Sequence, residues 1–395
     1  MMLPFFGQGR NTQSKSHARR GTSIQLESLD DRCLLSAGYE QLNLVGYQPG
    51  MARYTDANLN GWGLDFAPNG AICVANTSTG VATFYNRKGK TVAPPVTIPA
   101  AAIDPPGTPG SPTGVVYNPT SGFRITENGK SAPAEFIFDT LDGLICGWNP
   151  RVDPNHAIVI VDNSTEAPFG ASYTGLTMAH NSRGQNILYA ADSGSGPTTS
   201  NNRIDMFNGG FRSIGSFTDP SVASQDPGST VFQVENVNNK LFVTYTGFTA
   251  PLGGVVDVFD PAGHLLTPQH FAANAPGQGP LEAPWGIVQA PSHFGRFSND
   301  LLIGNVDGAG NINAFDPGTG AFLGPLTHPD GTPLAITGLW DLAFGEGGEQ
   351  GSKNDELIFT AGFTTEDPAG NGLFGVIVTQ NRAERSDVHR AFHEV

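Results

Sequence analysis

The sequence predicts an all-β fold, a six-bladed β-propeller that is closed by an N-terminal strand. Three observations predict it: short apolar runs between Pro, Asn and Gly turns, a pattern that recurs six times, and a spare strand before the first copy. The 395 residues include 51 Gly and 30 Pro, and charged residues make up only 14%. This composition is typical of many short strands joined by tight turns. No stretch of about 18 apolar residues occurs, so we expect no membrane span.

Residues 60–86 show the pattern most clearly. Apolar runs at 62–66, 72–75 and 81–85 are separated by the turn sequences APNG and NTSTG, and a fourth strand is predicted near residues 92–98. Pro, Asn and Gly supply the backbone angles that tight turns need, which indicates an antiparallel meander. A sheet this small needs neighbours of its own kind to bury its faces.

Five further copies supply those neighbours. The second copy has its inner strand at 114–117, and its residues 134–149 align without a gap with residues 71–86. The strands predicted for the other four copies are 174–176, 187–192 and 203–207; 232–234, 241–245 and 255–260; 285–287, 301–305 and 311–316; and 340–342, 357–361 and 373–378. The six inner strands start at Trp62, Thr113, Thr174, Phe232, Trp285 and Trp340, so three of the four tryptophans occupy this position. A period of 51 to 61 residues fits four-stranded blades around an axis.

The sixth copy lacks an outer strand, whereas residues 42–45 form a strand without a copy of their own. Pairing these two strands would close the ring and remove two exposed sheet edges. We therefore expect three segments. Residues 1–37 precede the repeats and are expected to be disordered or to form a short helix, residues 38–380 are the propeller, and residues 381–395 are a polar tail.

The N-terminal segment carries the motif LESLDDRCLLSA at residues 26–37, after a basic stretch. It resembles the leader motif of exported planctomycete proteins, which reads roughly L-E-x-L-E-D-R-x-L-L-S. Asp30 stands where that motif usually has Glu. The resemblance implies export and an extracellular or cell-surface location. From physics alone, the same residues could form a short amphipathic helix against the domain.

Three motifs, YTDANLNGWGL at residues 54–64, APWGI at 283–287 and GLWDLAFG at 338–345, resemble an uncharacterised bacterial family of exported propellers. The resemblance covers roughly residues 40–380. It implies the propeller fold but no established activity. Members often carry a C-terminal sorting signal, and the polar tail of this chain departs from them in offering none.

The candidate site follows from blade geometry. An inner strand begins on the ring face where the second strand ends, so the six starts meet the second-strand ends around the channel mouth. The ends are Asn76, Asp139, Asp192, Tyr245, Asn305 and Ala361. Aromatic walls with a few polar groups describe a small-molecule site. The predicted ligand-binding residues are Trp62, Asn76, Asp139, Asp192, Trp285, Asn305 and Trp340. Alternatively, each tryptophan is a packing wedge between blades, and each polar residue caps its own turn.

The sequence predicts no resident cofactor, with Ca²⁺ or another divalent cation as the alternative. Asp139 and Asp192 are the candidate metal ligands, helped by the ring amides, because Ca²⁺ takes six to eight oxygen ligands. The arrangement loosely resembles the gluconolactonase-like six-bladed hydrolases, which use a channel-bound divalent metal and an additional glutamate. No glutamate stands at the twelve ring positions, and Glu235, three residues into the fourth copy, is the nearest.

The favoured function is a non-catalytic, exported module that binds a protein, glycan or small molecule. The alternatives are a metal-dependent hydrolase of lactonase type at the channel mouth and a structural role at the cell surface. A formal net charge of −15 argues against nucleic-acid partners, because an acidic surface repels phosphate backbones. Catalytic residues are unknown. The nine histidines are scattered and are expected to be solvated, and Cys73 and Cys146 are expected to be buried thiols.

Overall fold

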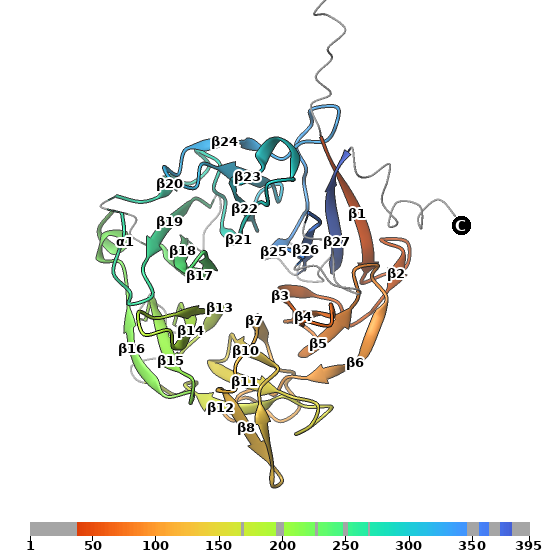
Figure 1. The fold of residues 1–395 in the computed structure, drawn as a ribbon, viewed down its shortest axis with the longest axis vertical. Coiled ribbons are helices and arrows are strands. Elements are labelled where there is room, and N and C mark those ends of the chain that lie inside the picture. The colour runs from red at the N-terminus through yellow and green to blue at the C-terminus, as the bar shows by residue number, and fades with distance from the viewer. Residues whose placement is uncertain are drawn as a thin grey trace, which may run out of the picture. The chain divides into compact units, whose positions relative to one another are not determined.

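Six β-sheets stand as blades around a common centre in the computed structural model (Figure 1). The structure describes residues 38–166, 170–194, 201–225, 228–247, 252–267, 269–345, 355–362 and 372–380. The predicted leader at residues 1–37 and the tail at 381–395 lie outside these residues. The predicted six-bladed β-propeller is therefore confirmed for the described residues between 38 and 380.

Each blade is an antiparallel meander whose first strand lies nearest the centre. Blade one contains β3 (Gly61–Phe66), β4 (Ile72–Asn76), β5 (Val81–Tyr85) and β6 (Thr91–Thr97). Blade two contains β7 (Pro112–Tyr117), β10 (Phe136–Thr140), β11 (Leu144–Trp148) and β12 (Ile158–Asp162), with a hairpin of β8 (Arg124–Glu127) and β9 (Lys130–Pro133). Blade three contains β13 (Tyr173–His180), β14 (Asn186–Asp192), β15 (Arg203–Asn208) and β16 (Ser213–Phe217).

The remaining blades follow the same order. Blade four contains β17 (Thr230–Val237), β18 (Lys240–Thr246), β19 (Gly254–Phe259) and β20 (Ala272–Asn274). Blade five contains β21 (Pro284–Gln289), β22 (Leu301–Asn305), β23 (Ile312–Phe315) and β24 (Phe322–Pro325), and blade six starts with β25 (Leu339–Phe344), β26 (Leu357–Ala361) and β27 (Leu373–Thr379). The described helices are α1 (Pro220–Gln225) and a 3₁₀ turn, η2 (Gly295–Phe297), and neither could cross a membrane.

The first and last described strands close the ring. β1 (Tyr39–Gly46) pairs antiparallel with β27, from Tyr39 opposite Thr379 to Gly46 opposite Leu373. Beyond the ladder, the Gln380 N–H donates to the Gly38 carbonyl at 2.9 Å. The short β2 (Tyr54–Thr55) adds parallel to β1 on its outer side. The predicted closure by the N-terminal strand is confirmed.

All six inner strands begin with a break in the pairing register to the second strand. In blade one, for example, the pairing skips from Gly61 to Leu64, and in blade five it skips from Pro284 to Ile287. The glycine after the starting residue sits where the next blade comes close. A Cβ on Gly63 would lie 2.7 Å from the Thr113 carbonyl oxygen, which explains glycine at this position.

The apolar core lies between neighbouring blades. One cluster joins blades three and four and includes Tyr189 and Ala191 of β14, Tyr245 of β18 and Val255 of β19, with Val222 of α1. Cys73 and Cys146 are buried and free, as predicted. The same packing between blades brings the starts of the inner strands together at the centre.

Candidate functional site

The three predicted tryptophans meet at the centre of the ring. Trp62 and Trp340 stack with ring centroids 3.6 Å apart, and Trp285 meets both edge-on at 6.4 and 6.1 Å. The Trp285 indole N–H donates to the Thr174 carbonyl at 2.9 Å. All three side chains are buried, so the sequence correctly placed them together, and most of their surface packs within the protein.

A cavity of about 300 Å³ opens over this cluster on the face where the inner strands begin. We call it the face pocket. Its apolar walls include Trp62, Trp340, Phe232, Leu141 and Leu252. Hydroxyl groups from Ser172, Thr174, Ser193, Thr230 and Thr246 line it as well, and Asp307 adds one carboxylate. Phe232, Leu141 and Leu252 are only partly buried, so they present apolar surface that a ligand can cover.

The two ring amides cap local backbone. The Asn76 side-chain oxygen accepts the Asn60 N–H at 2.8 Å, and its amide nitrogen donates to Thr83 Oγ1 and to backbone carbonyls. Asn305 accepts the Glu282 N–H at 2.8 Å and donates to the Pro280 carbonyl at 2.9 Å. Neither Asn76 nor Asn305 lines the face pocket, so both have the capping role that the sequence left as the alternative.

Asp139 is fully buried beside the start of its own inner strand. One oxygen, Oδ1, accepts from Thr113 Oγ1 at 2.7 Å and from the Gly114 N–H at 2.6 Å. The other, Oδ2, is buried without a hydrogen-bond partner. Burial raises the pKa of Asp139 to about 6, against the lowering effect of these two donors.

Asp192 has more partners. It accepts from the Ser172 and Gly194 N–H groups at 3.0 and 2.9 Å and from Asn201 Nδ2 at 2.8 Å. Arg203 lies 3.3 Å from Asp192 and also pairs with Asp205 at 2.6 Å and Glu166 at 2.8 Å. The guanidinium therefore supplies the positive charge in this acidic group. Among the described residues, Asp192 lies close enough to Glu166 and Asp205 to share an ion with them, whereas Asp139 does not belong to this group.

A larger cavity of about 520 Å³ occupies the channel on the opposite side of the tryptophans. Trp285 lines it, while Trp62 and Trp340 line the face pocket, so the aromatic cluster separates the two. Its acidic residues are Asp65, Glu235 and Asp341. Burial raises the pKa of Glu235 well above its ordinary value, and the charges of Asp341 and Asp65 raise it further. Burial also raises the pKa of Asp341 to about 7.

These channel carboxylates satisfy backbone groups across blade boundaries. Asp341 of blade six accepts the Leu64 N–H of blade one at 2.7 Å, and Asp65 of blade one accepts the Tyr117 N–H of blade two at 2.6 Å. An inner strand has a sheet neighbour on one side only, so its other N–H groups need such acceptors. The sequence analysis named Glu235 as the glutamate nearest the ring but missed Asp65 and Asp341. The signal for all three is an acidic residue one to three positions after the strand starts at Trp62, Phe232 and Trp340.

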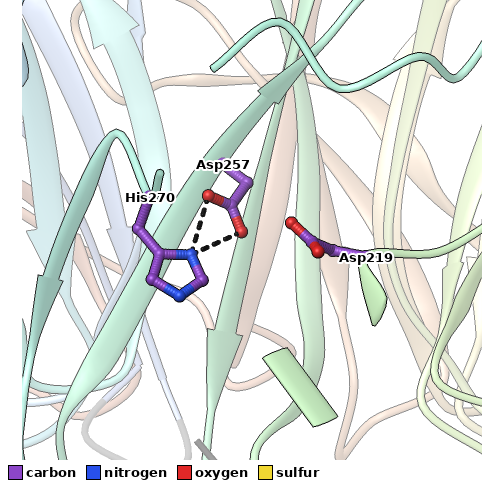
Figure 2. Close-up of side chains that lie close together, drawn as sticks. All are labelled: Asp219, Asp257 and His270. Carbon is purple, nitrogen blue, oxygen red and sulfur yellow. Dashed lines mark hydrogen bonds and ion pairs between the residues drawn. The ribbon is translucent and has the colours of Figure 1, made fainter. Parts of the chain in front are cut away.

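The prediction of solvated histidines was wrong for one residue. His270 is mostly buried and lies next to Asp257 and Asp219 at the outer side of blade four (Figure 2). His180 and His264 are exposed, as expected. The sequence feature that could have indicated this buried group is Asp257, which interrupts the apolar run of β19.

No known family profile matches the chain. It is 26% identical to the uncharacterized protein R648 of Acanthamoeba polyphaga mimivirus over 335 residues, which is 80% of this chain and 75% of that protein. The uncharacterized protein L690 of the same virus is 26% identical over 317 residues, 76% of this chain and 77% of its own length. These relatives are viral, so membership of a bacterial exported family stays a prediction from motifs.

Solved structures show the same architecture at low identity. The α-L-arabinofuranosidase Arb93A of Fusarium graminearum in complex with an iminosugar inhibitor has a TM-score of 0.53 and 11% identity, over 88% of this chain and 99% of that one. At that identity the likeness shows the fold alone. The chain is a six-bladed β-propeller that is similar in sequence to uncharacterized viral proteins.

Proposed function

We propose that this protein is an exported, non-catalytic binding module that takes a small uncharged ligand in the face pocket. The observation that carries the proposal is the lining of that pocket. Partly exposed Phe232 and Leu252 line the pocket with Trp62 and Trp340, and the Phe232 ring lies 5.7 Å from that of Trp340. Five hydroxyl side chains line it as well. An apolar wall with a few polar groups is the usual make-up of a small-molecule site.

The hydroxyl groups favour a ligand that donates hydrogen bonds. Ser193 donates its proton to the Ser172 carbonyl at 3.0 Å, and Thr246 donates to the Gly253 carbonyl at 3.2 Å. Their oxygen lone pairs remain as acceptors for a ligand hydroxyl. A sugar ring, with an apolar face and hydroxyl groups around its edge, has this chemistry. A hydroxyl whose proton is committed to a carbonyl lacks the base that a nucleophile needs, which supports a binding role.

Saturation-transfer NMR with a panel of neutral mono- and disaccharides tests the site. We expect transfer to at least one sugar in the wild-type protein and its loss in Phe232→Ala. Phe322→Ala is the matched control, because Phe322 is 48% exposed on the outer strand of blade five. No transfer to any sugar, or equal transfer in Phe232→Ala, would contradict the proposal.

Export rests on the leader resemblance at residues 26–37. A reporter fused to residues 1–40 should leave the cytoplasm of a host that uses this leader type. Replacing both Leu34 and Leu35 with Asp should abolish export, whereas retention of the intact fusion would remove the basis for an extracellular location.

A metal-dependent hydrolase of lactonase type is the second candidate. The buried Oδ2 of Asp139, which has no donor, is the observation in its favour. Asp192 supports it less, because Arg203 and three N–H donors already occupy that carboxylate. Lactone hydrolysis that needs an added divalent ion and disappears in Asp139→Asn would establish this function in place of the binding module.

A further inference from the structure

Three titratable side chains meet at the outer boundary between blades three and four (Figure 2). Asp219 precedes α1, Asp257 lies in the middle of β19, and His270 stands just before β20. One carboxylate oxygen from each aspartate and one ring nitrogen all lie within 4.8 Å of one another. His270 Nδ1 is 3.0 and 3.1 Å from the two oxygens of Asp257.

Asp257 occupies a core position. Side chains alternate along a strand, so Val255, Asp257 and Phe259 share one face of β19. Val255 and Phe259 belong to the apolar cluster between blades three and four, and Asp257 between them is 0% exposed. A carboxylate on such a face is costly unless a positive charge and hydrogen bonds compensate it.

Asp219 makes the charge imbalance larger. It is 3% exposed, and its Oδ1 accepts the Ser221 N–H at 2.7 Å. Its Oδ2 is buried, has no hydrogen-bond donor and turns toward Asp257 (Figure 2). Two carboxylates thus share one small space with a single imidazole.

Blade three shows how the same chain compensates such a pair with a side chain. Asp205 and Asp257 occupy equivalent positions in blades three and four. Asp205 on β15 pairs with Ala190 and Asp257 on β19 pairs with Val243, and both partners lie two residues before the predicted end of the second strand. Asp205 and its neighbour Asp192 have Arg203 between them. Over the described residues, the one ion pair of Asp257 is with His270. Val255 stands two residues before Asp257, where blade three has Arg203 two residues before Asp205, so no arginine occupies that place in blade four.

We propose that Asp219, Asp257 and His270 hold a divalent transition-metal ion, with Zn²⁺ as the reference ion. Two carboxylates and one neutral imidazole form the mixed oxygen and nitrogen set that Zn²⁺ or Mn²⁺ accepts. Ca²⁺ and Mg²⁺ fit less well, because they prefer oxygen ligands throughout. The ion neutralises both carboxylates and gives Asp219 Oδ2 a partner.

The site would act as a clamp between blades. Asp219 leads into α1, whose Val222 packs in the core between blades three and four, and Asp257 and His270 belong to blade four. An ion there ties the connection after blade three to the next blade. The side chain of His270 is 11% exposed, which leaves a route for the ion to enter. None of the three residues lines the face pocket, so the inference is independent of the proposed ligand.

Metal analysis of the full chain tests the proposal. Protein stripped with a chelator and dialysed against ZnCl₂ should retain about one zinc ion per chain. Zn²⁺ at a hundredfold excess over its Kd should raise Tm by about 3–5 °C. The double variant Asp219→Asn and Asp257→Asn should lose that zinc and the Tm response. Glu166→Gln is the matched control and should keep both, because Glu166 pairs with Arg203 and is not one of the three proposed ligands.

Two further measurements keep the test decisive if the double variant folds poorly. Co²⁺ bound to the wild-type protein should give a visible absorption band that changes in His270→Gln. A wild-type protein that retains neither Zn²⁺ nor Mn²⁺ and whose Tm responds to neither would overturn the proposal. Sugar binding should be unchanged in all these variants, which separates this result from the test of the face pocket.

Discussion

The indole rings of Trp62 and Trp340 stack with their centroids 3.6 Å apart, and they belong to the first and the sixth blade. The contact therefore joins the two ends of the ring at its centre, far from the strand pairing that joins them at the edge. A double-mutant cycle should measure it. Trp62→Leu and Trp340→Leu should show a coupling free energy of about 0.5–1.5 kcal/mol in urea unfolding. Trp62 and Trp148, which share no core cluster, form the control pair and should add within about 0.5 kcal/mol.

Closure at the edge depends on β1. Deleting residues 1–37 should leave the propeller folded, because it removes no described strand. Deleting residues 1–46 removes β1 and exposes the edge of β27, so Tm should fall and the protein should aggregate. Equal melting of both truncations would show that β1 is dispensable.

Asp341 should make stability depend on pH. Its pKa is raised from 3.8 to about 7, so the folded state holds a proton that the unfolded state releases. Its contribution to the free energy of unfolding is full below pH 4 and is lost as the pH rises through 7, at up to about 1.4 kcal/mol per pH unit. Asp341→Asn should flatten this decline between pH 5 and 8 in urea titrations.

The same variant should also cost about 1–3 kcal/mol at every pH, because an amide cannot accept the N–H groups of both Leu64 and Leu342. Asp316→Asn is the control. Asp316 is exposed with a lowered pKa, so its loss should not alter the slope above pH 5. An unchanged slope in Asp341→Asn would assign the pH dependence to other groups.

Arg203 should be a large contributor to stability in blade three. Arg203→Met leaves Asp192 and Asp205 buried side by side without their cation, which should cost about 3–5 kcal/mol in chemical denaturation. Adding Asp205→Asn to that variant should recover part of the loss. Arg212→Met is the control, because Arg212 is exposed. If Arg203→Met lowered the free energy of unfolding no more than Arg212→Met does, this role of Arg203 would be contradicted.

The strand starts and the ring closure could be predicted from the sequence because both depend on the local pattern of apolar and turn residues. Trp62, Trp285 and Trp340 mark the same place in three blades, and residues 42–45 had no other partner. The direction of each polar side chain was harder to read. Asn76 and Asn305 end their second strands as predicted, yet both point into local caps, because the nearest unpaired N–H groups belong to the preceding loop.

The channel carboxylates Asp65 and Asp341 were missed for a related reason. Whether Asp65 or Asp341 faces the channel depends on the register break at each strand start, which turn composition does not reveal. The group of Asp219, Asp257 and His270 comes from three separate elements of two blades, so no spacing marks it. A single aspartate between Val255 and Phe259 was its only sign.

The pairing of β1 with β27 also fixes the order of events during synthesis. β1 leaves the ribosome first, but its partner strand follows about 330 residues later, which at 5–20 residues per second is a wait of about 15–65 s. Throughout that time the edge of β1 that later pairs with β27 has no partner, because the strands of blade six have not yet been made. Blades one to five can fold one after another, whereas the ring becomes cooperative only with its last strand. A nascent chain of this protein is therefore most exposed to aggregation and to chaperone capture until β27 has been made.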